Sequence, residues 1–200
     1  AGFRLVQSSQ ESSESRNKYE SDRLVDQYLL FHYGSTEEQQ DQAIRNRVGH
    51  PAVDNFVVHT ASLLSRHVHR QGRALDLGCA VGRASFELAR HFETVVGLDY
   101  SGSFIRSAQH LKAHGKLPYR RQETGRYFSE LVARVPAGID RSRVEFIEGD
   151  ACSLDSELPN DEQAFDGILL ANLLCRLSDA EACLRQFTGS DRWLKADGIL

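Results

Sequence analysis

One stretch constrains the fold more than any other part of the chain: "RALDLGCAVGRASFELARHFETVVGLDYS", from Arg73 to Ser101. It begins with a short apolar run, continues through a glycine-rich turn and a segment with helical periodicity, and ends with a second apolar run closed by Asp99. Short apolar runs bounded by turn residues are typical of buried strands, and a helix between two of them is typical of a parallel β-α-β unit. The stretch therefore predicts two parallel strands joined by a helix over Arg83–His91.

The same alternation continues toward the end of the sequence. Helical periodicity covers Ser103–His114, apolar runs follow in "RVEFIEGDA" and "FDGILLANLL", and a last helix is expected over Asp179–Leu194, before "KADGIL". This order predicts an α/β fold, a Rossmann-like doubly wound and mostly parallel sheet with helices on both faces. A sheet that stopped at the start of a fifth strand would leave an unpaired edge, so we expect the polypeptide to continue beyond Leu200 or a partner to cover that edge.

The part of the chain before this sheet divides in two. Residues 1–16 are rich in Ser, Glu and Gln, a composition typical of a flexible tail or linker. Residues 17–70 form a predicted helical extension, in which apolar side chains at helical spacing indicate helices over Tyr19–Tyr33 and Pro51–Val68. We therefore expect one domain, residues 17–200, with helices ahead of its sheet.

The predicted core, residues 72–200, contains an insertion over about 115–142. This segment is longer than an ordinary connection between a helix and a strand. Within it, "GRYFSELVARV" has helical spacing and is ended by Pro136 and Gly138. The sequence therefore predicts an inserted helix.

Composition excludes some classes of partner and location. The chain has 24 Lys plus Arg against 28 Asp plus Glu, a formal charge of −4, so we expect neither a nucleic acid nor a membrane surface as its partner. The four cysteines form no C-x-x-C pair and lie in apolar or helical patterns, which favours reduced thiols in a cytoplasmic protein and no bound metal. The sequence contains no apolar run of about 18 residues, so it predicts no membrane span.

The glycine-rich turn identifies a class of ligand. A dinucleotide site needs G-x-G-x-x-G, but this chain has Ala80 and Arg83 at the second and third glycine positions, and no Gly-Lys-Ser/Thr of a phosphate loop follows. The pattern D-x-G-x-A-x-G, formed by Asp76, Gly78, Ala80 and Gly82, resembles motif I of the class I S-adenosylmethionine-dependent methyltransferases, with alanine replacing the middle glycine. A carboxylate suits a ligand that carries a sulfonium and an ammonium, and glycines let the backbone approach it.

The resemblance places further cofactor contacts at successive strand ends, where ligands bind in open α/β sheets. Asp99 is expected to accept hydrogen bonds from the ribose hydroxyls, Asp150 to lie near the adenine amino group, and Asn172 to lie where cofactor and acceptor meet. A helix cap is the alternative role for Asp99, and a turn is the alternative for Asp150. The complete predicted cofactor set is Asp76, Gly78, Cys79, Ala80, Gly82, Asp99, Tyr100, Asp150, Ala151, Cys152 and Asn172.

A closer resemblance covers most of the chain, from Asn17 to Leu177. The stretches "NKYESDRLVDQYLLFHYG", "DLGCAVGRASFELAR" and "ANLLCRL" are similar to the C-terminal methyltransferase domain of ovothiol synthases, the 4-mercaptohistidine N1-methyltransferase family. The resemblance implies methylation of the imidazole π nitrogen of 5-thiohistidine to give ovothiol A, with S-adenosylhomocysteine as the other product. It also implies an iron-dependent sulfoxide synthase domain, fused to this one or working with it.

Such an acceptor is a small zwitterionic imidazole, and three residues are our candidates for its catalytic site. Methyl transfer from a sulfonium depends mainly on positioning the acceptor lone pair. Tyr19 and Asn172 are expected to orient the ring, and Arg176 to bind the substrate carboxylate, with a surface salt bridge as the alternative role for Arg176. Tyr28, Phe31 and Tyr33 are candidates for a lid or an aromatic wall of the site, although core packing explains Tyr28 and Phe31 better.

Two other functions remain open at this level. The first is methylation of another small molecule or of RNA, since the insertion carries basic residues interleaved with tyrosines. The second is a non-catalytic module that binds S-adenosylmethionine and recruits a partner. Cofactor binding without turnover would favour the second.

Overall fold

The structure is a computed structural model that describes residues 21–39, 55–123, 126–158, 164–188 and 192–200. Its centre is a sheet with the strand order β5-β2-β1-β6-β7, in which every neighbouring pair is parallel. The strands are β1 (Arg73–Leu77), β2 (Thr94–Asp99), β5 (Val144–Glu148), β6 (Phe165–Leu169) and β7 (Leu194–Ile199). The predicted parallel sheet is confirmed.

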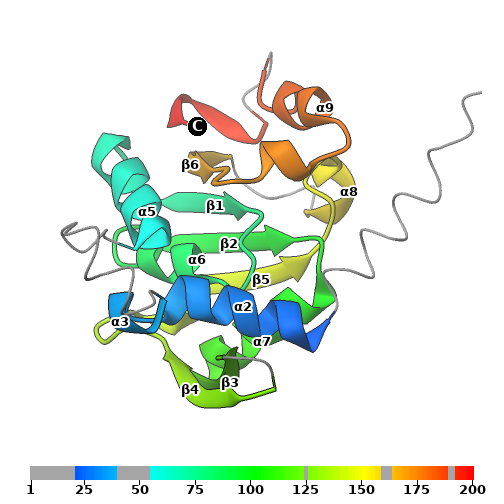
Figure 1. Ribbon diagram of the computed structural model, residues 1–200. Helices are drawn as coiled ribbons and strands as arrows, with labels where there is room; N and C mark the ends of the chain where they lie inside the picture. Colours follow the sequence, from blue (N-terminus) through cyan, green and yellow to red (C-terminus); the bar gives the residue numbers. More distant parts are fainter. Residues whose placement is uncertain (1–20, 40–54, 124–125, 159–163, 189–191) are drawn as a thin grey trace, which may run out of the picture.

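Helices cover both faces of this sheet. Each face has its own apolar core, because consecutive residues of a strand point to opposite sides. On one face, Ala74 of β1 and Val95 of β2 belong to an apolar core shared with α5 (Phe56–His67), α6 (Arg83–Leu88) and α7 (Gly102–His114). On the other, Leu75 and Val96 share a core with α8 (Leu154–Glu157) and α9 (Ala180–Arg185). Figure 1 shows α5 and α6 in front of the sheet, so the doubly wound arrangement is also confirmed.

The two longest helices of the sheet's front layer begin and end at residues suited to those positions. The side chain of Asn55 accepts hydrogen bonds from the backbone N–H groups of Val57 and Val58 at the start of α5. Ser101 caps α7 through Phe104, and Gly115 ends that helix with φ 73°, in the left-handed region that glycine adopts at low cost. Short turns therefore connect these helices to the strands that follow or precede them.

The N-terminal extension adds α2 (Asp22–Tyr33) and α3 (Thr36–Gln39). Helices α2 and α5 start later than the expected Tyr19 and Pro51, which lie outside the described residues, because Ser21 and Asn55 are non-helical caps directly before them. Helix α2 crosses in front of the sheet and contacts α7 (Figure 1). No helix in the described ranges is long and apolar enough to cross a membrane.

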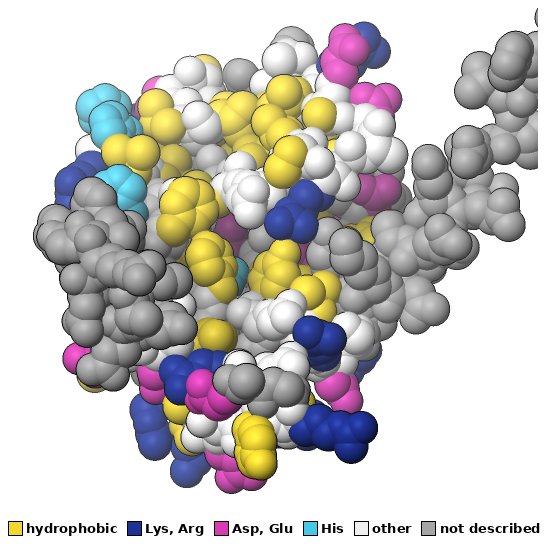
Figure 2. Space-filling model, viewed as in Figure 1, with side chains coloured by type: hydrophobic (Ala, Val, Ile, Leu, Met, Phe, Trp, Pro, Cys, Tyr) yellow, Lys and Arg dark blue, Asp and Glu magenta, His cyan; other side chains and the backbone are white. Residues whose placement is uncertain are grey.

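The predicted inserted helix is wrong. The segment instead forms an antiparallel hairpin of β3 (Lys116–Gln122) and β4 (Phe128–Arg134), which packs on α2 and α7. Ser129, Leu131 and Ala133 of β4 are the less exposed residues, and they alternate with exposed neighbours as a strand requires. In Figure 2, Lys and Arg mix with Asp and Glu around this hairpin, and hydrophobic side chains occupy the middle of the same face.

Two helix ends also differ from expectation. Helix α6 ends at Leu88 rather than His91, because the backbone N–H of His91 bonds Leu88 O in a tighter turn. Helix α9 ends at Arg185, and Leu194, expected to end that helix, is instead the first residue of β7. The last predicted helix is therefore much shorter, and the fifth strand starts earlier than expected. Two short 3-10 helices, η1 (Arg141–Arg143) and η2 (Leu174–Arg176), complete the described elements.

Candidate functional site

The loops that carry the predicted site leave the same edge of the sheet. Strands β1, β2, β5 and β6 run parallel, and Asp76 of β1 pairs with Gly97 of β2 and with Leu169 of β6. Asp99 of β2 in turn pairs with Glu148 of β5. The carboxyl ends of four strands therefore lie side by side, as the arrowheads in Figure 1 show for β1, β2 and β5. We call this the carboxyl edge.

The glycine turn after β1 has an unusual backbone. Gly78, Ala80 and Gly82 all have positive φ angles, of 75°, 48° and 81°. This region favours glycine, so Ala80 is strained by about 1 kcal/mol or more. A side chain on Gly82 would have its Cβ 2.6 Å from the ring of Phe146, which explains why glycine is needed there. The turn is held to β2, since the backbone N–H groups of Gly78 and Cys79 both donate to Leu98 O.

Asp99 joins the glycine turn to the start of α7. One carboxylate oxygen, Oδ2, accepts the backbone N–H of Ala80 at 2.8 Å, and the other, Oδ1, accepts that of Ser101 at 2.9 Å. The bond to Ala80 fixes the strained residue, and the bond to Ser101 fixes the residue that caps α7. A carboxylate accepts up to about four hydrogen bonds, so this structural role is compatible with the predicted contact to ribose hydroxyls. Tyr100, the next residue, is 41% exposed at the same edge.

Asp76 lies beneath the turn rather than on its exposed side. It is only 2% exposed, and the Ser85 hydroxyl of α6 donates to its Oδ2 atom at 2.6 Å. Burial raises the pKa of Asp76 to about 7; the Ser85 bond opposes this rise and the nearby charge of Asp99 adds to it. Asp76 therefore exposes little surface for the predicted direct contact with the ligand's positive groups. Its hydrogen bond to Ser85 of α6 was not predicted from the sequence.

The two cysteines of the predicted set are thiols, not thiolates. Burial raises the pKa of Cys79 well above its ordinary value, and burial together with Asp150 raises the pKa of Cys152 to about 11. Neither is suited to act as a nucleophile.

The turn after β5 places Asp150 as one of its structural residues. Its Oδ1 atom accepts the backbone N–H of Cys152 at 2.8 Å, and its carbonyl accepts that of Ser153. The turn role considered for Asp150 is therefore confirmed, and the adenine contact stays a prediction. Ala151 is buried beside it and Cys152 is half-buried, so both can pack against a flat ring at this edge.

The loop after β6 reaches back to the glycine turn. Asn172 is exposed and has φ 57°. In the described ranges, Ala80 and Asn172 are the two non-glycine residues with a positive φ angle. Leu173 packs on Gly78, where an added Cβ would lie 2.9 Å from Leu173 Cδ1. Sequence reasoning missed Leu173, because a leucine after an apolar strand has no signal of its own. Arg176 is exposed at the end of η2, and the predicted catalytic residue Tyr19 lies outside the described residues.

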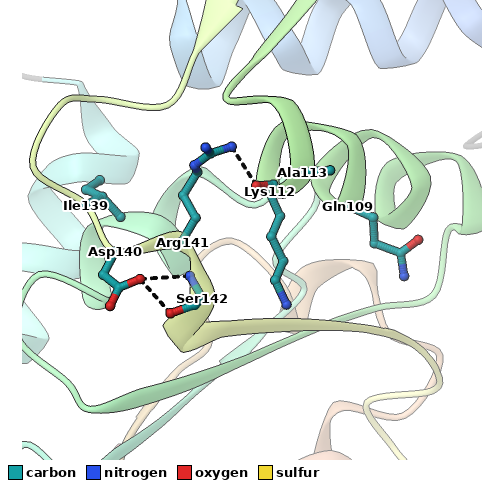
Figure 3. A pocket seen from close by; sticks show the side chains of 7 residues that line it. All are labelled: Gln109, Lys112, Ala113, Ile139, Asp140, Arg141 and Ser142. Carbon is teal, nitrogen blue, oxygen red and sulfur yellow. Dashed lines mark hydrogen bonds between the residues drawn. The ribbon is translucent and has the colours of Figure 1, made fainter.

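Two hollows lie at the opposite edge of the sheet, which we call the amino edge. The first, of about 500 Å³, is lined by residues of the α7 end and of the segment before β5 (Figure 3). The second, of about 420 Å³, runs across the amino ends of β1, β2 and β5. Lys112 and Ser142 line both. Neither hollow includes a predicted site residue, so the candidate site is assigned from the strand ends.

Comparisons with known proteins agree with this geometry. Residues 75–200 match the family described as "Methyltransferase domain". Among solved structures, the [4+2]-cyclase SpnF is 20% identical with a TM-score of 0.55, covering 92% of this chain and 57% of its own. No curated protein matches the chain.

Two further solved structures are similar at lower TM-scores. The YcgJ protein from Bacillus subtilis is 20% identical, with a TM-score of 0.49 over 70% of this chain and 47% of its own. A TehB-like SAM-dependent methyltransferase from Corynebacterium glutamicum is 21% identical, with a TM-score of 0.46 over 79% of this chain and 68% of its own. The chain spans about half of the length of the first structures it matches.

Proposed function

Because the chain belongs to the methyltransferase domain family, its cofactor class is S-adenosylmethionine, and we propose that it transfers the cofactor's methyl group to the imidazole π nitrogen of 5-thiohistidine. The main support for the cofactor site is the pair of hydrogen bonds that Asp99 accepts, one from Ala80 in the glycine turn and one from Ser101 at the start of α7. The acceptor is supported by the resemblance of three stretches of the chain to the ovothiol synthase family.

The proposed reaction asks the protein mainly to position two molecules. Methyl transfer is an in-line displacement, in which the acceptor nitrogen attacks the methyl carbon and the sulfonium leaves as a thioether. The attacking nitrogen must be unprotonated, and a hydrogen bond to the other ring nitrogen can select that tautomer. Asn172, exposed on the loop beside the glycine turn, and Tyr19 are our candidates for that bond. Arg176 on the same loop would bind the substrate carboxylate.

The partners, domain limits and location follow the same proposal. An iron-dependent sulfoxide synthase domain would supply the thiohistidine, and residues 1–16 would be a linker ahead of the domain formed by residues 17–200. All four cysteines are free thiols, which supports a cytoplasmic location.

A second reaction class stays in view because the fold alone does not determine chemistry. The similar structure SpnF is described as a cyclase. A non-catalytic module or a methyltransferase with another acceptor would share every feature of the glycine turn described above. The acceptor therefore has to be identified by experiment.

The test is mass spectrometry of a reaction that contains the protein, S-adenosylmethionine and 5-thiohistidine, with histidine as the matched control. We expect a gain of one methyl group on thiohistidine and none on histidine. Methylation of neither compound, with S-adenosylhomocysteine still binding in a calorimeter, would reject the acceptor and keep the cofactor. Absence of binding would reject the cofactor as well.

A further inference from the structure

The C-terminal end of α2 is bonded directly to the glycine turn. The hydroxyl of Tyr33 donates to the backbone carbonyl of Val81 at 3.0 Å. Val81 lies between the strained Ala80 and Gly82, the residue directly before α6, and it is fully buried. Burial raises the pKa of Tyr33 well above its ordinary value, against the opposing charge of Arg83, so the hydroxyl keeps its proton and remains a donor.

A second bond joins the same two regions. The Nη1 atom of Arg83, the first residue of α6, donates to His32 O at 3.2 Å. The guanidinium also lies 5.4 Å from the centre of the Tyr33 ring and forms an ion pair with Glu87 at 2.9 Å, in which both side chains are largely buried. Carbonyls in the last turn of a helix lack partners within the helix, and Arg83 shares one of those of α2 with the side-chain amide of Asn55, which donates to His32 O at 3.0 Å.

Helix α2 is also fixed to the second helix that begins at the carboxyl edge. The ring of Tyr28 lies 4.5 Å from that of Phe104 in the first turn of α7, and Leu29 is 1% exposed between these layers. On its outer side, Asp26 accepts the backbone N–H of Arg120 in the hairpin. Helix α2 is thus bonded to the glycine turn and packed on α7, the two regions that Asp99 joins, although it comes from a distant part of the sequence.

From these contacts we propose that Tyr33 is a positioning residue for the cofactor, because its bond to Val81 holds the glycine turn in the strained conformation that presents Ala80 to Asp99. The inference rests on the proposed function for its ligand. Binding of the cofactor and docking of α2 are then linked, so each one strengthens the other by the same factor. Sequence reasoning considered Tyr33 only as a lid or wall; here it acts from behind the turn, through the backbone.

The direct test removes only the hydroxyl. In Tyr33→Phe we expect the dissociation constant of S-adenosylhomocysteine, measured by calorimetry, to rise about three- to tenfold, the effect of one lost hydrogen bond. The Michaelis constant for S-adenosylmethionine should rise equally, while the rate at saturation stays unchanged. The matched control is Tyr127→Phe, at a tyrosine that is 78% exposed on the hairpin, which should bind as the wild type does. Equal affinity in all three proteins would overturn the proposal.

A second measurement does not depend on the ligand. The backbone N–H of Ala80 is bonded to Asp99, so its hydrogen exchange reports whether the turn is held. We expect faster exchange at Ala80 in Tyr33→Phe than in Tyr127→Phe. Equal exchange in the two variants would overturn the role proposed for Tyr33, whether or not the wild-type protein binds S-adenosylhomocysteine. A wild-type protein that binds no S-adenosylhomocysteine would reject the proposed function and leave the exchange result standing. Arg83→Lys, which keeps the charge beside Glu87 but loses the fork that reaches His32 O, should change both readouts in the same direction.

Discussion

The two edges of the central sheet are built in opposite ways. The carboxyl edge has two strained residues, Ala80 and Asn172, and a carboxylate bonded to two backbone N–H groups, while its loops pack on one another. The amino edge carries two hollows, and Lys112 lines both of them. Strained residues that hydrogen bonds hold in place indicate a geometry that is maintained for a purpose.

The largest expected effect compares two glycines with similar backbones. Gly82 at the carboxyl edge and Gly138, in the segment leading to the amino edge, have φ angles of 81° and 77°. A Cβ at Gly82 would lie 2.6 Å from Phe146, whereas at Gly138 the nearest atom is 3.7 Å away, at the end of Arg90. We expect Gly82→Ala to lower the free energy of unfolding by about 3 kcal/mol, since overpacking adds to backbone strain. Gly138→Ala should lose only about 1 kcal/mol, from strain alone.

Urea unfolding of both variants and of the wild type measures these changes in the free energy of unfolding. Similar losses for the two would mean that the space around the glycine turn is not a constraint, and the contrast between the edges would fail on this point.

The next effect concerns cofactor affinity. Asp99→Ala removes the acceptor that holds Ala80 and Ser101, so we expect S-adenosylhomocysteine to bind about thirtyfold more weakly, or about 2 kcal/mol, the usual range for hydrogen bonds to a charged group. Glu145→Ala, which removes a carboxylate lining the amino-edge hollow, is the matched control and should bind normally. Calorimetry decides between the two edges, and an unchanged affinity for Asp99→Ala would remove the carboxyl edge as the cofactor site.

Two buried groups on the carboxyl-edge side of the molecule give opposite pH dependences. Burial raises the pKa of Asp76 from 3.8 to about 7, so the folded protein holds a proton that the unfolded chain releases, and stability falls as pH rises between about 4 and 7. Burial, and then the charge of Arg83, lowers the pKa of His32 from 6.5 to about 3. The unfolded chain then binds the extra proton, and stability rises with pH between about 3 and 6.5. In wild-type protein the two slopes oppose each other.

Single variants should separate these slopes. In Asp76→Asn, stability should rise between pH 4 and 6.5 by up to about 1.4 kcal/mol per pH unit, and in His32→Gln it should fall with a similar slope. Urea midpoints at several pH values in this range measure both. Parallel pH profiles for the two variants would contradict the assignment. By contrast, Asp140 at the amino edge is exposed, and its bonds to Ser142 lower its pKa.

The smallest effect is expected at the amino edge. Lys112→Ala removes one of the two side chains that line both hollows, and we expect S-adenosylhomocysteine affinity to change by less than about twofold, because substitutions away from a site have small effects. A clear loss of affinity, again measured by calorimetry, would show that the hollows take part in cofactor binding.

The core of the fold could be predicted because its signals are local. Apolar runs, a glycine turn with its spacing and a regular alternation identify β1, β2, β5 and β6 without knowledge of their neighbours. The residues at their ends, Asp99 among them, follow from the rule that ligands bind at the carboxyl ends of parallel strands.

The hairpin could not be predicted because its signal is not local. "GRYFSELVARV" contains strong helix formers, and its apolar residues fit helical spacing as well as alternation. What selects the strand is the packing of β4, whose inward residues are Leu131 and Ala133, against α2, which lies about 100 residues earlier in the sequence. The same applies to the bond from Tyr33 to Val81, which joins residues 48 apart, and to the burial of Asp76, which depends on Ser85 reaching back from α6.

The position of α2 has a consequence for synthesis on the ribosome. This helix is made before its partners in the glycine turn, in α7 and in the hairpin, and Arg120 follows Asp26 by 94 residues. At elongation rates of about 5–20 residues per second, the apolar face of α2 waits roughly 5 to 20 s for the last of them. During that interval the nascent chain exposes Leu29 and Tyr28 to water, although in the folded protein Leu29 is buried and Tyr28 packs on Phe104.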